Sequence, residues 1–227
     1  MALARAGANV AIGCRDMPAG ESLAQELRSL GARAMAVSMD MNLLAAIPLA
    51  VAAVEEELGP LSILVNNAGH SRPAPALDVE VADFDAMFDL NLKAAFFASQ
   101  AAARRMAVHG RGAIVNIASQ AGLVALPGES VYCMSKAAMI HMTRCLAVEW
   151  APRQIRVNAV APTFIRTDGT QRWLGDPAFL KSLLARIPLG RVGEPQNVAE
   201  PVVFLASPAA ALITGATLVI DGGWTVV

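Results

Sequence analysis

Cysteine and long hydrophobic runs are scarce in this sequence, and each shortage excludes a class of protein. The 3 cysteines form an odd, sparse set, which argues against a disulfide framework and favours a reducing cytoplasm. Neither they nor the 3 histidines have the spacing of a zinc motif, so we expect no metal site. The longest apolar run, residues 43–54, contains a proline and is too short to cross a bilayer as a helix. We therefore expect a cytoplasmic protein that does not enter a membrane.

Clusters of basic residues and linker-like segments are absent too. The formal net charge is -1 and the arginines are scattered, whereas nucleic-acid binding usually requires a basic face. No repeat, charge run or Gly/Ser-rich tract interrupts the 227 residues, of which 55% are hydrophobic. This composition is enough for one sizeable core, and it predicts a single domain over residues 1–227 without a nucleic-acid partner.

Short apolar segments alternate regularly with longer helical patterns along the chain. The strand-like segments are 9–14, 33–38, 62–67, 112–118, 155–161 and 216–221, and the helical ones are 18–30, 48–58, 80–108, 131–151 and 195–206. The strand-like segments lack polar alternation, which is typical of strands buried on both faces. The alternation predicts an α/β fold with a doubly wound parallel sheet, in which ligands bind beyond the carboxyl ends of the strands.

Polar side chains follow the third, fourth and fifth of these strand-like segments. They are the NNAG turn at Asn66–Gly69, Ser119, and the PTFIRT segment at Pro162–Thr167. Tyr132, the only tyrosine, begins the next helix, and Lys136 lies one turn later on the same face. A nearby ammonium is expected to lower the pKa of the phenol, which could then exchange a proton with an alcohol or carbonyl. Each feature alone is also consistent with a polar turn, a helix cap or a surface pair.

A series of motifs occurs in a fixed order along nearly the whole chain: NNAG, LNLKAAF, IVNIAS, YCMSK, VNAVAPT and GATLVIDGG. In order and spacing this series resembles the short-chain dehydrogenase/reductase family. The resemblance implies a Rossmann-like oxidoreductase that transfers a hydride between a nicotinamide cofactor and an alcohol or carbonyl carbon. It also implies a homotetramer and a substrate lid over residues 168–193. The lid and the DGGWT ending resemble members that act on polyols, sugars or gluconates, and a 3-oxoacyl or small-ketone reductase is the alternative.

The resemblance also implies roles for individual residues. Tyr132 would be the catalytic acid/base, and Ser119 would orient the substrate oxygen. Lys136 would bind the nicotinamide ribose and lower the pKa of Tyr132, while Asn91 resembles the asparagine that holds a water in the proton relay. The implied cofactor-binding residues, besides Tyr132 and Lys136, are Arg15, Asp40, Asn66, Ala68, Gly69, Ile165 and Thr167.

The end of the first strand-like segment bears on cofactor choice. In members that prefer NAD, an acidic residue there binds both hydroxyls of the adenosine ribose. This chain has Cys14 followed by Arg15, and a guanidinium suits a 2′-phosphate. The sequence therefore predicts NADP(H) rather than NAD(H), with Asp16, one residue further on, as the feature that favours NAD(H).

The chain lacks the strand and the glycine-rich turn with which the family begins. That turn presents backbone N–H groups to the cofactor pyrophosphate, and about 25–30 residues of the family pattern are missing. Because the missing strand is central in the family's sheet, two strand edges are expected to be unpaired. A start codon further upstream, a fragment, and a non-catalytic remnant that serves as an oligomer subunit all explain the difference, and we favour the first. Thr163 stands where the family usually has glycine.

Overall fold

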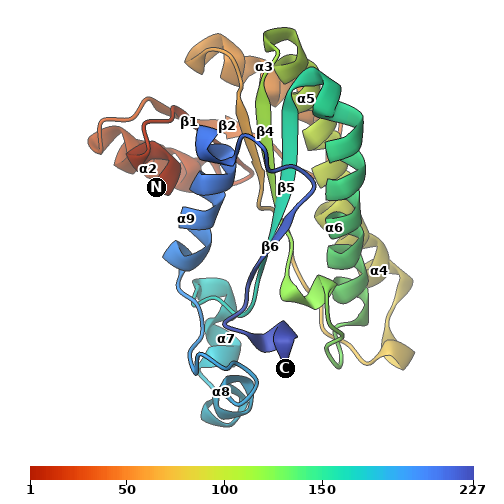
Figure 1. Ribbon diagram of the computed structural model, residues 1–227. Helices are drawn as coiled ribbons and strands as arrows, with labels where there is room; N and C mark the ends of the chain where they lie inside the picture. Colours follow the sequence, from red (N-terminus) through yellow and green to blue (C-terminus); the bar gives the residue numbers. More distant parts are fainter.

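The computed structural model describes all residues 1–227 and contains parallel strands that alternate with helices (Figure 1). The strands are β1 Val10–Cys14, β2 Ala34–Ser38, β3 Ile63–Asn66, β4 Gly112–Ile117, β5 Ile155–Pro162 and β6 Thr217–Ile220. The helices are α1 Ala2–Arg5, α2 Met17–Ser29, α3 Ala46–Leu58, α4 Val81–Phe88, α5 Ala95–His109, α6 Ser130–Trp150, α7 Gln171–Leu174, α8 Pro177–Leu184 and α9 Pro195–Ala206. The predicted α/β fold is confirmed. None of the helices combines the length and apolar character that crossing a bilayer requires.

The strands form two separate sheets. β1 pairs with β2, while β3, β4, β5 and β6 form a four-stranded sheet in that order. All pairs are parallel, with Val10 opposite Ala34 in the small sheet and Ile63 opposite Ala113 in the large one. The two unpaired edges expected from the sequence are present, one on β1 and one on β3. Residues 63–65 of β3 consequently stay partly exposed, whereas most of β4 is buried.

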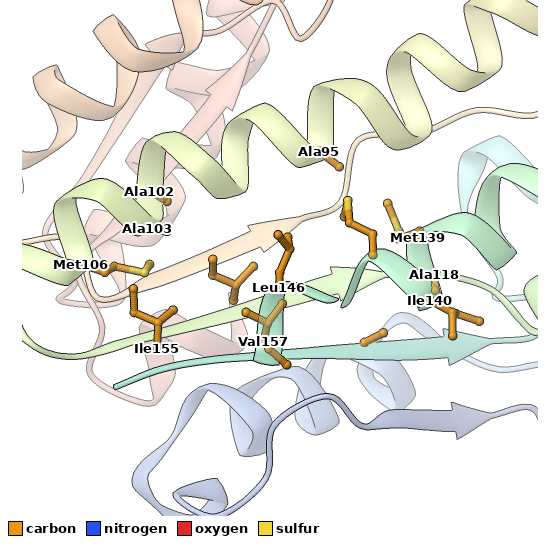
Figure 2. Packing of buried hydrophobic residues seen from close by; sticks show 14 residues of the cluster. Ala95, Ala102, Ala103, Met106, Ala118, Met139, Ile140, Leu146, Ile155 and Val157 are labelled. Atoms are coloured by element: carbon orange, nitrogen blue, oxygen red, sulfur yellow. The ribbon is translucent and has the colours of Figure 1, made fainter. Parts of the chain in front are cut away.

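The main core lies between the four-stranded sheet and helices α5 and α6. Figure 2 shows Met106 of α5, Leu146 of α6 and Val157 of β5 in this layer, and all three are almost fully buried. Helix α9 covers the opposite face through a second cluster made of Val115, Val160, Val202 and Leu205. Because both faces of β4 and β5 are covered, their sequences are nearly continuous apolar runs. Burying one side chain such as Leu146 stabilises the fold by roughly 1.5–3 kcal/mol, so this layer fixes the strand ends firmly.

The helix expected over residues 80–108 is interrupted by a wider turn. Between α4 and α5, residues Asp89–Ala94 form a π-helix. Such turns insert an extra residue into a helix and occur frequently at functional sites. Here the π-helix places Asn91 in the interior, where it is 0% exposed.

Residues 168–193 lie beyond the carboxyl ends of the strands, where they form α7 and α8 (Figure 1). Their apolar side chains form a cluster of their own, which contains Leu174, Leu183, Ile187, Val192 and, from the C-terminal segment, Trp224. This cluster is separate from the main core. It gives the segment its own packing and holds it over the strand ends.

Candidate active site

A cavity of about 740 Å³ lies at the carboxyl ends of β3, β4 and β5. Its walls come from the loops after these strands, from the start of α6 and from the α7–α8 segment. Of the site residues predicted from the sequence, Gly69, Ser119, Tyr132, Lys136, Ile165 and Thr167 line it. The other five, Arg15, Asp40, Asn66, Ala68 and Asn91, lie outside its lining. The cavity therefore unites three of the four proposed catalytic residues, Ser119 from the loop after β4 and Tyr132 and Lys136 from α6.

Ser119 and Tyr132 face each other across the start of α6. Ser119 follows β4 and caps a short 3₁₀ turn, because its Oγ accepts a hydrogen bond from the backbone N–H of Ala121 at 3.1 Å. The Ser119 hydroxyl also lies near the Tyr132 phenol and acts to lower its pKa. The serine thus caps a turn and also stands beside the phenol. Its capping role, which the sequence alone would explain, is therefore compatible with a catalytic role.

Lys136 lies one turn beyond Tyr132 on α6 and is only 4% exposed. Its Nζ donates a hydrogen bond to the Ile117 carbonyl at 2.7 Å and lies 5.8 Å from the centre of the Tyr132 ring. Burial disfavours the ammonium and lowers the pKa of Lys136 from 10.5 to about 8. The cation therefore sits at the end of β4, in the proposed site, without a carboxylate partner.

The predicted effect of Lys136 on the Tyr132 pKa is wrong for this structure. The pKa of Tyr132 is raised, chiefly because burial disfavours the phenolate, while the nearby Ser119 hydroxyl acts in the opposite direction. Lys136 is directed at the Ile117 carbonyl, and its ammonium is itself weakened by burial. Desolvation, a property of the packed fold, sets the direction of the Tyr132 pKa, and the Lys136 charge one turn away is not among its causes.

Asn91 holds the loop after β3 against α6. Its Nδ2 donates to the His70 carbonyl at 2.9 Å and to Ser135 Oγ at 3.1 Å, and its Oδ1 accepts from the His70 N–H at 2.9 Å. A β-carbon added at Gly69 would meet Asn91 Oδ1 at 3.0 Å and Lys136 Nζ at 3.4 Å. The asparagine, the glycine and the lysine are thus packed together. The water relay implied for Asn91 stays a prediction.

Comparison with known proteins identifies the family to which this site belongs. A family model described as enoyl-(acyl carrier protein) reductase matches residues 1–225. The chain belongs to the short-chain dehydrogenase/reductase family. It is an oxidoreductase of the class that transfers a hydride between a nicotinamide cofactor and a CH–OH or carbonyl group, as the resemblance implied.

Relatives of this short-chain dehydrogenase/reductase differ in what they do. D-threitol dehydrogenase from Mycolicibacterium smegmatis is 40% identical over 99% of this chain and 86% of its own length. A crystal structure of gluconate 5-dehydrogenase from Burkholderia cenocepacia in complex with NADP and tartrate has a TM-score of 0.96 and 34% identity, covering 100% of this chain and 89% of that one. The inactive 2-(S)-hydroxypropyl-CoM dehydrogenase 2 of Xanthobacter autotrophicus is 41% identical over 100% of this chain and 99% of its own length.

The site of this short-chain dehydrogenase/reductase fits the nicotinamide half of a cofactor. The missing β-carbon at Gly69 leaves room for the chain to run beside the Lys136 ammonium, which is a donor suited to ribose hydroxyls. Ile165 and Thr167 also line the cavity, and the Thr170 hydroxyl fixes the loop between them by donating to the Ile165 carbonyl at 2.6 Å. None of residues 1–227 forms a glycine-rich turn at the start of a helix that would hold the pyrophosphate.

The structure uses the Asn66 side chain internally. Its Nδ2 donates to Ser99 Oγ at 2.8 Å and to Asn116 Oδ1 at 2.7 Å, and Asn116 in turn donates to Thr143 Oγ1 at 2.9 Å. This buried polar chain links β3, β4 and α6. Ala68 and Gly69 form the exposed loop that follows Asn66. Because the Asn66 side chain is engaged, the predicted cofactor contacts of Asn66 and Ala68 would have to be made by backbone atoms of the loop. These contacts stay predictions.

Arg15 and Asp16 follow β1, in the two-stranded sheet, and neither lines the cavity. Arg15 is exposed and takes part in none of the ion pairs, whereas the Asp16 carboxylate accepts from the Ala19 N–H at 3.0 Å and caps α2. Asp40, which follows β2, accepts from the Asn42 N–H at 2.9 Å in a turn. The guanidinium is therefore free for a ligand, while the acidic residue that would compete with it is engaged.

Sequence reasoning missed several polar residues of the cavity. Gln120 is 1% exposed, and neither end of its amide has a hydrogen-bond partner. Nε2 of His70 is likewise buried without a partner, and burial lowers the His70 pKa. Glu129 hydrogen-bonds Ser71, and burial raises its pKa. Gln120 stands next to Ser119 in the NIASQAG motif, and this position is the one feature of the sequence that could have indicated its place in the cavity.

Proposed function

We propose that the chain is an NADP(H)-dependent oxidoreductase of polyhydroxy substrates such as polyols, sugars or gluconates. The observation that carries this proposal is the cavity in which Ser119, Tyr132 and Lys136 meet. Beside its apolar surface the lining has hydrogen-bonding side chains such as His70, Gln120 and Thr163, which suit a hydroxylated substrate. The relatives named for D-threitol and gluconate support the same substrate class.

In this proposal each catalytic residue acts at a defined atom. The phenol oxygen of Tyr132 gives a proton to the carbonyl oxygen in reduction and takes one from the hydroxyl in oxidation. The Ser119 hydroxyl, which lies near the phenol, orients the substrate oxygen beside it. Lys136 binds the ribose hydroxyls next to Gly69. The nicotinamide, when bound, supplies or accepts the hydride.

The α7–α8 segment forms the substrate lid in this proposal. Trp173, Phe179 and Leu183 line the cavity, and Leu174 is buried in the cluster that anchors the segment. The segment is thus anchored by its own apolar cluster and also presents aromatic side chains to the cavity, which it covers. Such cover excludes water from the reacting groups.

A substrate panel tests the proposal. The chain is incubated with NADP⁺ and D-threitol, galactitol or gluconate, and in the reverse direction with NADPH and a 3-oxoacyl thioester or a small ketone, and NADPH absorbance is followed. We expect turnover of at least one polyhydroxy compound and a lower kcat/KM for the thioester and the ketone. Turnover of the thioester alone would establish the acyl reductase instead.

The preference for NADP(H) rests on the free guanidinium of Arg15 and the engaged carboxylate of Asp16. Because a charge-assisted hydrogen bond contributes roughly 1.5–3 kcal/mol, Arg15→Ala is expected to raise the KM for NADPH about tenfold or more and to leave the KM for NADH unchanged. Arg111→Ala, at an exposed arginine that precedes β4, is the control. Equal effects on both cofactors would remove the basis for the preference.

The homotetramer is also part of the proposal. Large apolar side chains remain exposed on the helices that cover one face of the sheet, including Val108 on α5 at 78% and Val148 on α6 at 77%. Exposed apolar surface shared by two neighbouring helices suits a helix-to-helix subunit interface. Size-exclusion chromatography with light scattering is expected to give four copies, and a monomer at micromolar concentration would contradict this.

A non-catalytic subunit is the second candidate. It is favoured by the relative named as inactive, which is 41% identical and is matched over 99% of its own length. Titration of the chain with NADPH, followed by nicotinamide fluorescence, separates the candidates. Micromolar binding supports the enzyme, and the absence of binding supports the subunit.

A further inference from the structure

We propose that the substrate carries an anionic terminal group and that Arg172 and Arg186 bind it. This inference rests on the proposed function, since it narrows the polyhydroxy class to compounds with an acidic end. Both arginines belong to the α7–α8 segment, and both line the cavity. The sequence showed no charge cluster in this segment, because 13 residues separate the two. The fold brings both to the same cavity.

Each guanidinium is held over a tryptophan that also lines the cavity. The Cζ atom of Arg172 lies 3.8 Å from the centre of the Trp173 ring, and that of Arg186 lies 5.6 Å from a ring of Trp224. A guanidinium that contacts an aromatic face keeps the N–H groups at its edge available for a planar anion. The two side chains are therefore positioned in advance for a carboxylate or a phosphate.

Neither arginine is neutralised by an ion pair. Neighbouring cationic side chains are engaged: Arg166 pairs with Glu194 at 3.2 Å, and Arg191 donates to Asn197 Oδ1 at 3.1 Å. Arg172 and Arg186 take part in none of the salt bridges of the chain.

The lining of the cavity carries an excess of positive charge. Glu129 is the one carboxylate in the lining, and it hydrogen-bonds Ser71. Burial raises the pKa of Glu129, and the charge of Arg172 acts to lower it without forming an ion pair, so the other arginine is the one farther from compensation. Lys136, the remaining cation, is directed at the Ile117 carbonyl beside the phenol. Positive charge is thus left over on the α7–α8 wall, while the catalytic groups stand on the wall formed by β4 and α6.

The separation of the catalytic groups from the two arginines matches a substrate with two chemically different ends. A hydroxyl or carbonyl carbon reacts beside Ser119 and Tyr132, and an anion at the far end is held by the two arginines. Aldonates and sugar phosphates both have this form, and bidentate binding by arginine suits a carboxylate and a phosphate alike. A neutral alditol of the same length would leave the two cations without a partner.

Three substrates and three variants test the inference. Gluconate, glucitol 6-phosphate and glucitol are compared as a carboxylate, a phosphate and a neutral compound of similar length. The variants are Arg172→Gln, Arg186→Gln and, as the matched control, Lys181→Gln. Lys181 is an exposed cation on α8 that lies outside the cavity lining. The ratio of kcat/KM for gluconate to that for glucitol 6-phosphate shows which anion is preferred.

We expect Arg172→Gln and Arg186→Gln each to raise the KM for the preferred anion about tenfold, with kcat and the kinetics of glucitol nearly unchanged. Lys181→Gln is expected to behave as the wild type. A wild-type enzyme that uses glucitol as well as the anions would overturn the inference. So would variants that raise the KM for charged and neutral substrates alike.

A binding measurement keeps this inference separable from the proposed function. The Tm is measured with and without gluconate, glucitol 6-phosphate and glucitol for the wild type and the variants. If no compound is turned over but an anion raises the Tm of the wild type and fails to do so for Arg172→Gln, the proposed function fails and the anion site stands. If neither anion raises the Tm and no turnover depends on charge, the anion site fails.

Discussion

Replacing Lys136 with methionine is expected to stabilise the protein while removing its activity. The lysine is 4% exposed, has no carboxylate partner, and makes one hydrogen bond, to the Ile117 carbonyl at 2.7 Å. Burial of an ammonium without a counter-ion lowers the free energy of unfolding, and the lowered pKa of Lys136 reflects this loss. The group is retained, in our account, for its role beside Tyr132 rather than for stability.

The size of the effect follows from the pKa of Lys136, which burial lowers from 10.5 to about 8. Since each pKa unit is worth about 1.4 kcal/mol, the buried charge costs roughly 3 kcal/mol at neutral pH. Methionine has a similar volume and no charge, but it loses the hydrogen bond to Ile117, which is worth about 1 kcal/mol. The variant should therefore be more stable than the wild type by about 2 kcal/mol at pH 7.

The higher stability of the methionine variant should disappear at alkaline pH. Between pH 8 and 10.5 the unfolded chain keeps the proton that the folded lysine has released, so the stability of the wild type rises with pH in this window. Below pH 8 both states are protonated and the full cost is present. At pH 9.5 the remaining cost is about 1 kcal/mol, which the lost hydrogen bond offsets, so wild type and variant should then be equally stable.

Urea unfolding measures this directly. Free energies of unfolding are determined at pH 7 and at pH 9.5 for both proteins, without cofactor and at one fixed protein concentration. Other titrating groups cancel in the difference between the two proteins. A variant that is less stable than the wild type at pH 7, or a difference that does not change with pH, would refute the reasoning.

Further predictions concern the pH profile, the unpaired glutamine and the buried polar chain. Because burial raises the Tyr132 pKa, the phenol keeps its proton from pH 7 to 10, so kcat/KM for alcohol oxidation should increase over this range with the small phenolate fraction while that for carbonyl reduction stays nearly constant, and profiles that do not diverge would contradict the role of the phenol. Gln120→Leu should increase the free energy of unfolding by about 1–2 kcal/mol, since it removes a buried amide without partners; a comparable loss in urea unfolding would show that the amide is hydrogen-bonded in solution. Asn116→Leu should lower it by roughly 2–3 kcal/mol, because Asn66 and Thr143 both lose a partner, and a neutral result would show that the polar chain adds nothing.

The elements of the fold were predictable because their signals are local or follow burial directly. β4 and β5 are covered on both faces, so their sequences are apolar runs that leave little choice of secondary structure. Gly59 ends α3 with φ at 91°, a conformation that favours glycine, and it was a visible helix stop. The order of the motifs then gave the family, and with it the cavity residues Ser119, Tyr132 and Lys136.

The rest depends on contacts between distant parts of the chain. The π-helix at Asp89–Ala94 has no local signal, since its residues suit an ordinary helix; Asn91 bonds to His70 and Ser135, which lie 21 and 44 residues away. The direction of the Tyr132 pKa was mispredicted because neighbouring charge is visible in a sequence and desolvation is not. Arg172 and Arg186 line one cavity only through the folding of the α7–α8 segment.

The central claim is that the Tyr132 phenol transfers the proton in a nicotinamide-dependent reaction, and Tyr132→Phe tests it most directly. Turnover of a polyhydroxy substrate with NADP⁺ is followed by NADPH absorbance for the wild type and the variant, with circular dichroism and Tm to verify folding. We expect the variant to keep its fold and to lose about 10²–10⁴-fold in kcat/KM. A folded variant with wild-type turnover would contradict the account.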